Sequence, residues 1–171
     1  MVPDERLITS TPCAPWLPDG STAEAWAGSD CTVPDPSIIV RLLLVRQMAG
    51  ATEFFCVPTD RGLDLPTLRL GSGAALMTAG QGLALLASRT CDRADAPHHC
   101  VGYIRNVVPN PDSAYPHPTP WAHVPVFVPT EAVNPVCDGT WLNPDSARDG
   151  LSVRHWWPIV EHHLNAVGGA P

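Results

Sequence analysis

The sequence predicts an α/β fold in which helices cover a mixed, twisted sheet. Segments with β-branched or alternating apolar residues lie on both sides of a segment with helical periodicity, and a second helical segment follows near the C-terminal end. The expected order is β-β-α-β-β-(β)-α, which is typical of helices packed against a sheet. The length of 171 residues fits one domain of ordinary size.

Residues 1–35 are expected to form an irregular arm ahead of the folded domain at 36–171. The arm is rich in proline and in small polar residues, a composition typical of loops. Its two tryptophans, Trp16 and Trp26, are expected to pack it against the rest of the molecule.

Two strands are predicted next along the chain. Residues 37–48, SIIVRLLLVRQM, suit a buried central strand whose apolar run is interrupted by Arg41 and Arg46. Residues 53–58, EFFCVP, are expected to form a second strand after an Ala-Gly-Ala turn.

The first helix is predicted from near Gly73 to about Cys91. Its apolar residues recur at intervals of three and four and form one stripe, Leu76, Ala79, Leu83 and Leu86. Gly80 and Gly82 each weaken a helix by roughly 1 kcal/mol relative to alanine. Close packing against the sheet is therefore needed to hold this helix.

Two further strands are predicted at 98–108 and 121–129, joined by a Pro-rich loop. The first strand places four side chains on one face, Val101, Tyr103, Arg105 and Val107. In the second strand, Pro125 has no N–H group and indicates an edge or a bulge. A short strand is expected at 139–142. A helix is expected at 153–167, with a proline that either kinks it or marks its first turn.

This order of segments, together with the phrases RLLLVRQ, LDLPTLRL-G and GYIRNVV, resembles the Nudix hydrolase superfamily over about residues 37–167. The resemblance implies a Nudix-like α/β/α sandwich with a mixed twisted sheet at 36–171. It also implies a catalytic helix whose glutamates bind Mg²⁺ or Mn²⁺, because hard divalent cations need carboxylate oxygens.

The helix of this chain does not carry the family's box, G-x5-E-x7-R-E-U-x-E-E-x-G-U. With the box aligned so that its helix ends at Cys91, the first glutamate falls at Leu76 and the glutamate-rich run falls at 84–91. No Asp or Glu lies between Asp64 and Asp92, so no shift of the alignment restores a carboxylate. A divergent member with a degenerate box, no metal site and no metal-dependent pyrophosphohydrolysis is therefore expected.

Four residues outside that helix are the candidates for acid–base chemistry, His117, His123, Tyr103 and Glu53. By the resemblance, the Pro-rich loop and the strand after it line the ligand cleft, which favours His117 and His123. A satisfied, partly buried histidine is the structural alternative for either of them.

Four further residues are candidates for substrate binding, Arg105, Asn106, Phe55 and Trp121. A buried arginine needs an anionic ligand or an internal carboxylate partner, for which the sequence offers Asp60, Asp64 and Glu53. Phe55 and Trp121 are suited to stack on a planar ligand, with core packing as the structural alternative.

Composition narrows the partners and the mechanisms. The formal charge of −7 and the scattered arginines argue against nucleic acid, and all 10 basic residues are arginine, which excludes lysine-based mechanisms. No apolar run is long enough for a membrane span, and a cytoplasmic location is expected. The six cysteines show no CxxC pair, and pairing of Cys13 with Cys31 is left open.

Three functions are consistent with these observations. The first is a repurposed small-molecule enzyme that uses metal-independent acid–base chemistry in a cleft, without a cofactor. The second is a catalytically silent protein that binds a ligand or regulates a partner, and the third is a residual metal-dependent hydrolase of a nucleoside diphosphate derivative. The expected partner is a small-molecule ligand, and homodimerisation is left open.

Overall fold

The structure is a computed structural model that describes residues 4–71 and 73–168. A six-stranded sheet has the strand order β1-β2-β8-β9-β3-β7, and a smaller sheet has the order β10-β5-β4, with β6 paired to β5. The elements are β1 (Arg6–Pro12), β2 (Thr22–Cys31), β3 (Ile39–Leu42), β4 (Val45–Met48), β5 (Ala51–Thr59), β6 (Gly62–Asp64), β7 (Thr67–Arg69), η1 (Gly73–Ala75), α1 (Ala79–Thr90), β8 (His98–Val107), β9 (Trp121–Pro129), β10 (Thr140–Leu142), α2 (Pro144–Leu151) and α3 (Trp157–Gly168).

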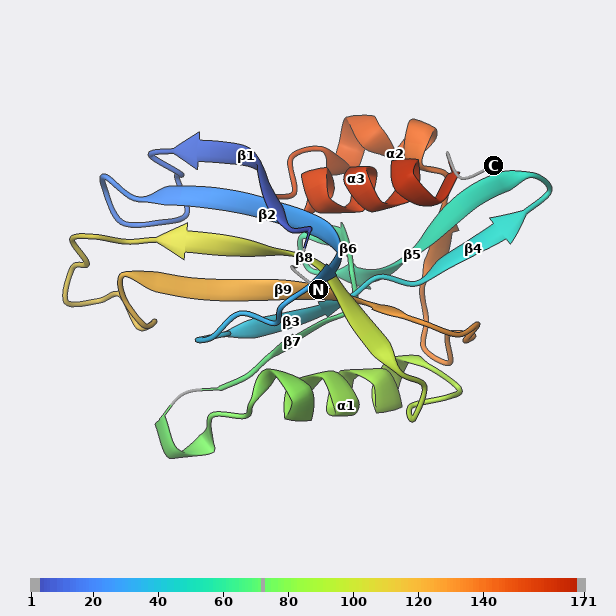
Figure 1. The fold of residues 1–171 in the computed structure, drawn as a ribbon, viewed down its shortest axis with the longest axis horizontal. Helices are drawn as coiled ribbons and strands as arrows, with labels where there is room; N and C mark the ends of the chain where they lie inside the picture. The colour runs from blue at the N-terminus through green and yellow to red at the C-terminus, as the bar shows by residue number, and fades with distance from the viewer. Residues whose placement is uncertain (1–3, 72, 169–171) are drawn as a thin grey trace.

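The predicted α/β/α sandwich with a mixed sheet is confirmed. Strand β9 pairs antiparallel with β8 and parallel with β3, so the large sheet is mixed. Because successive side chains of a strand point to opposite faces, Val124, Val126 and Val128 of β9 pack in the cluster that contains α3. Phe127 packs in the cluster that contains Leu86 of α1. The two helices therefore cover opposite faces of the sheet (Figure 1).

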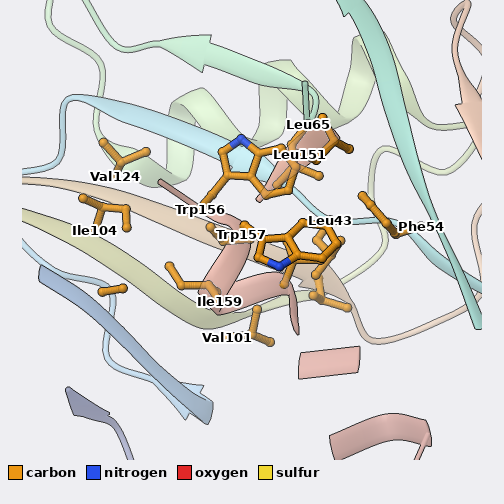
Figure 2. Packing of buried hydrophobic residues seen from close by; sticks show 14 of the residues in the cluster. Leu43, Phe54, Leu65, Val101, Ile104, Val124, Leu151, Trp156, Trp157 and Ile159 are labelled. Carbon is orange, nitrogen blue, oxygen red and sulfur yellow. The ribbon is translucent and has the colours of Figure 1, made fainter. Parts of the chain in front are cut away.

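The core on the α3 side is built around two tryptophans at the start of that helix. Trp156 is fully buried and lies beside Leu65 and Leu151, while Trp157 lies near Leu43 (Figure 2). Removing such a buried ring costs about 3–5 kcal/mol. No helix in the described part of the chain is long and apolar enough to cross a membrane.

The prediction of an irregular N-terminal arm is wrong for residues 4–35, because they contain β1 and β2. Strand β2 pairs with β8 from Thr22 opposite Val107 to Cys31 opposite Cys100. Its alternate residues Ala23, Ala25 and Ala27 are buried. Alanine has little strand preference of its own, so the pairing with β8 selects this conformation. The domain boundary at residue 35 stays a prediction.

The predicted strand at 37–48 is divided between the two sheets. Strand β3 lies in the large sheet and β4 in the small one, and the fully buried Leu43 and Leu44 connect them. The prediction of one central strand is wrong in this respect, because an uninterrupted apolar run gives no sign of where a chain changes sheet.

Pro125 is not on an edge strand, because β9 lies between β8 and β3. The ladder between β9 and β3 is interrupted at this proline. Ile38 donates to the His123 carbonyl before it, and Leu43 donates to the Phe127 carbonyl after it. A bulge does occur beside it, on β8 between Cys100 and Gly102. The missing N–H therefore faces a gap in the pairing.

The predicted helices and their neighbours are found with shifted ends. Helix α1 begins at Ala79, after a capping box formed by Thr78 and Gln81, so Leu76 lies outside it and is exposed. Pro158 is the second residue of α3, which confirms its place in the first turn. The short strand at 139–142 is confirmed as β10, whereas α2 was not predicted. All six cysteines are free, and Cys31 lies opposite Cys100 rather than Cys13.

Candidate functional site

A cleft of about 610 Å³ opens on the α3 face of the large sheet. Its floor is formed by Ile39, Asn106 and Val124 of three neighbouring strands. Its walls come from segments that are distant in the sequence: the β1–β2 connection, the β8–β9 loop, the β5–β6 turn, β6 and the turn before α3. These segments contribute Trp16, Tyr115, His117, Arg61, Asp64, Arg154 and His155. A shallower hollow of about 730 Å³ adjoins it across Trp16 and Tyr115 and has no basic side chain in its lining.

The cleft is positively charged although the chain is acidic. It contains four of the 10 basic residues but only two of the 17 acidic ones, Asp60 and Asp64. The basic residues are Arg41, Arg61, Arg69 and Arg154. Guanidinium groups present several donors in a fixed plane that matches carboxylate and phosphate oxygens. The cleft is therefore suited to an anionic ligand.

At one end of the cleft, Asp64 is the centre of a network of hydrogen bonds. Oδ1 of Asp64 accepts hydrogen bonds from Arg41 Nη1 at 3.0 Å, from Trp156 Nε1 at 2.7 Å and from the Leu65 N–H at 2.8 Å. Nη1 of Arg41 also donates to Thr67 Oγ1 at 2.9 Å. Burial lowers the pKa of Arg41, and the adjacent Asp64 opposes that effect. This carboxylate is engaged by the protein itself.

Arg41 retains an unused donor in this network. Its side chain is almost fully buried, at 6% exposure, and its Nε has no hydrogen-bond partner among the described residues. An unpaired buried donor costs about 1–3 kcal/mol. This cost arises from placing the guanidinium inside the wall of the cleft, where the Nε is covered by the protein itself.

His155 stacks between Arg41 and the indole of Trp16. Its Nε2 lies 3.4 Å from Arg41 Nη2, and its ring centroid lies 5.5 Å from that of Trp16 with an angle of 26° between the planes. Burial, followed by the charge of Arg41, lowers the pKa of His155 to about 4. The imidazole is therefore neutral at pH 7, and its Nε2 can accept the arginine N–H.

Two of the predicted site residues, His117 and Asn106, line the cleft. Asn106 is only 8% exposed, and its Oδ1 has no partner among the described residues. His117 is half-buried and packs edge-on against Tyr115, with ring centroids 5.4 Å apart. Burial and the charge of Arg69 lower the pKa of His117. The catalytic role of His117 and the binding role of Asn106 stay predictions.

Arg105, Tyr103, His123 and Trp121 lie together on the opposite face of the sheet. Arg105 Nε donates to His123 Nε2 at 3.0 Å, and His123 Nδ1 lies 2.8 Å from the Pro36 carbonyl. Both ring nitrogens of this buried histidine are thus engaged, and burial lowers its pKa. Neither ring nitrogen is free to exchange a proton with a ligand, which favours a structural role for His123.

The guanidinium of Arg105 is held by aromatic rings and one carboxylate. It lies 4.1 Å from the centroid of Trp121 and 5.1 Å from that of Trp26. Its ion-pair partner is Glu24, at 3.9 Å, rather than Asp60, Asp64 or Glu53. Arg105 and Asn106 are adjacent in β8 and therefore point to opposite faces, so the chain does not bring these two predicted binding residues together.

Glu53 and Phe55 lie in the smaller sheet, outside the cleft. Glu53 pairs with Arg46 at 2.9 Å on the neighbouring strand β4. Phe55 is 2% exposed and packs edge-on against Trp141, with ring centroids 5.4 Å apart. Neither side chain lines the cleft, and the catalytic role of Glu53 and the stacking role of Phe55 stay predictions.

The residues at α1 do not fit a hard divalent cation. The helix has no acidic residue, and the described residues contain no group of three or more His, Cys, Asp or Glu side chains arranged to hold a metal ion. Such a cation requires several carboxylate oxygens.

The mixed sheet between α1 and α3 gives the chain an α/β sandwich fold. The chain is similar to a solved structure described as a Caenorhabditis elegans Ap4A hydrolase binary complex, with a TM-score of 0.51 and 10% sequence identity. The similarity covers 77% of this chain and 98% of the other, and at this identity it establishes the fold alone. No family model matches the sequence, and no curated protein matches it.

Proposed function

We propose that this protein binds a small molecule carrying a phosphate or diphosphate group in the arginine-lined cleft. The observation that carries the proposal is the gathering of Arg41, Arg61, Arg69 and Arg154 in one cleft of a chain with a net charge of −7. A local positive field of this kind concentrates anions and raises their association rate.

Binding of inorganic pyrophosphate and of ADP, measured by calorimetry, tests this proposal. Arg69 is exposed and forms no salt bridge in the described structure, so Arg69→Gln should leave the fold intact. We expect it to weaken binding about tenfold, which corresponds to one lost charge-assisted contact of about 1.4 kcal/mol. Affinity should also fall as the salt concentration rises.

The matched control is Arg89→Gln, which removes the same charge from the exposed end of α1, outside the cleft. It should change affinity by less than about twofold, because exposed charges at a distance are screened. Equal affinities for Arg69→Gln and Arg89→Gln, or no binding of either probe, would overturn the proposal.

A second candidate function is metal-independent acid–base catalysis on the bound molecule by His117. It is favoured by the position of this half-buried imidazole in the cleft beside Arg69, and by the absence of a hydrogen bond to its ring within the described residues. A lowered pKa keeps the ring neutral at pH 7, as a general base requires.

A panel of nucleoside diphosphate derivatives assayed in EDTA tests this second function. The His117→Asn variant should lose about 10²-fold in kcat while still binding pyrophosphate. The control His162→Asn, at a site on α3 outside the cleft, should retain activity. Turnover that survives in His117→Asn would remove this residue from the mechanism. Binding without turnover of any compound would favour a catalytically silent binding protein.

We also propose that α1 is a degenerate Nudix box, so any turnover should proceed without Mg²⁺. The alternative is a residual metal hydrolase that uses Asp60, Asp64, Asp92 or Glu53, of which only Asp60 and Asp64 line the cleft. Asp64 is already engaged by three protein donors, whereas Asp60 has no hydrogen-bond or salt-bridge partner among the described residues. Phosphate release that depends clearly on Mg²⁺ would contradict metal-independent chemistry and favour this reading.

A further inference from the structure

The cleft continues into a second hollow of about 450 Å³. The two share four lining residues, Ile38, Ile39, Arg69 and His117, so they form one continuous depression. Arg69 and His117 stand at the border between them. A ligand held by the arginines can therefore extend past His117 into the second hollow.

The second hollow, which we call the extension, has a mostly apolar lining. Beyond the four shared residues it is lined by Pro36, Leu76, Pro116 and Pro118, together with Ser37 and Gly71. Among the described residues that line it, the only charged one is the shared Arg69, and none is a Phe, Tyr or Trp that could stack on a nucleobase. The composition thus changes from cationic to aliphatic along a single depression.

Leu76 is held at the rim of the extension by the backbone before α1. The turn at Gly71 has φ +88°, and its Cα approaches the Ala75 carbonyl closely enough that an added Cβ would lie 3.0 Å from that oxygen. The Met77 N–H donates to the Leu70 carbonyl at 2.8 Å and closes this loop. Leu76 is 49% exposed, so its side chain is available to contact a ligand in the extension.

We propose that the ligand of this cleft is an amphiphilic anion, with a phosphate or diphosphate head at the arginines and an aliphatic chain in the extension. This inference rests on the proposed function and adds the substrate class. Burial of the chain against prolines, Ile39 and Leu76 removes apolar surface from water on both sides. A chain-free phosphate would leave this surface exposed.

A series of methyl, butyl and octyl phosphates, used below micelle-forming concentrations, tests the inference by calorimetry. Each methylene buried in the extension should raise affinity by about two- to fourfold, because burial of one methylene is worth up to about 0.8 kcal/mol. The gain should stop when the extension is full. Pyrophosphate serves as the chain-free reference probe.

The variant Leu76→Gln makes the rim polar without changing charge or size greatly. It should reduce the octyl-to-methyl affinity ratio at least fivefold and leave the affinity for methyl phosphate and pyrophosphate unchanged. The control is Val136→Gln, which alters an equally exposed apolar side chain, at 60% exposure, outside both hollows. This control should behave like the unmodified protein.

The outcomes separate the inference from the proposed function. Affinities that do not depend on chain length, or a chain-length gain that is unchanged by Leu76→Gln, would overturn the inference while pyrophosphate binding still supports the cleft. Failure of every phosphate, pyrophosphate included, to bind would overturn both. A chain-length gain that is lost in Leu76→Gln but retained in Val136→Gln supports the inference.

Discussion

The imidazole of His155 illustrates how single side chains of the cleft depend on their surroundings. It lies between the indole of Trp16 and the guanidinium of Arg41, and both burial and that positive charge disfavour its protonated form. The folded protein therefore releases this proton at a lower pH than the unfolded chain does. This difference in proton binding links the free energy of unfolding to pH.

We expect the free energy of unfolding to decrease as the pH falls from about 6.5 to about 4, through protonation of His155 in the unfolded chain only. The pKa of His155 is lower in the folded protein than in the unfolded chain. The free energy of unfolding therefore has its full value above the unfolded pKa and decreases as the pH falls below it. One proton contributes a slope of about 1.4 kcal/mol per pH unit. Urea unfolding at several pH values measures this slope of the free energy of unfolding against pH. We expect the slope for His155→Gln to be smaller than that of the unmodified protein by the contribution of about one proton.

His163 provides an independent comparison, because burial lowers its pKa to about 4 as well. The variant His163→Gln should reduce the same slope by a similar amount, and the double variant should remove both contributions. Identical slopes for His155→Gln and the unmodified protein would show that the imidazole is not held neutral by the cleft.

Strand parity decides which single residues could be assigned to the site from the sequence. Arg105 and Asn106 are neighbours in a predicted strand, and the alternation of faces places only one of them on the cleft side. The sequence alone indicates both, because it gives no sign of which face of the strand is covered. Arg41 is visible as a charge within an apolar strand, yet its partner Asp64 becomes apparent only in the folded chain, where the side chains of these two residues meet.

At the scale of elements, α1 shows how a helix without charged residues at its start is stabilised. Thr78 accepts from the Gln81 N–H at 3.1 Å, and the Gln81 side chain accepts from the Thr78 N–H at 2.9 Å. This capping box satisfies two donors that a helix start leaves free. Gly82 then allows the helix to approach Leu70 and Val40 of the sheet.

The two glycines of α1 should respond oppositely to alanine. A Cβ on Gly80 would meet nothing nearer than Thr78 Oγ1 at 4.0 Å, so Gly80→Ala should stabilise the fold by about 0.5 kcal/mol. A Cβ on Gly82 would overlap the side chain of the fully buried Leu70, so Gly82→Ala should destabilise it by about 1–3 kcal/mol. Urea denaturation measures both, and a stabilised Gly82→Ala would contradict the close packing.

Helices and strands are predictable where the apolar pattern of the sequence is strong, and their prediction fails where that pattern is weak. Strands β8 and β9 and helices α1 and α3 have clear periodicity, and each was expected close to its observed place. Helix α2 has the polar sequence PDSARDGL with a single buried residue, Leu151, so it gives little periodic signal. Strand β2 alternates alanine with polar residues, a pattern that becomes a strand only when β8 supplies the partner.

At the scale of the whole molecule, the cleft is a product of the topology. Its arginines come from β3, β7, the β5–β6 turn and the segment before α3, and no local pattern in the sequence connects them. The resemblance indicated the sandwich correctly, whereas the location of the basic cleft required the assembled fold. The N-terminal segment contributes Trp16 to the cleft and two strands to the sheet, so it forms part of the same structure.

Truncation separates this integrated arrangement from a detachable arm. Deletion of residues 1–13 removes β1, an edge strand that is exposed except for the half-buried Ile8, and should cost only about 1–2 kcal/mol. Deletion of residues 1–35 also removes β2 and its buried alanines. This deletion exposes the edge of the adjacent β8 and the face of α3 that packs against the sheet. Because domains have only about 5–15 kcal/mol of stability, we expect this larger deletion to abolish cooperative unfolding in urea. A variant of residues 36–171 that unfolds cooperatively, with an unchanged midpoint, would show that β1 and β2 are an independent arm.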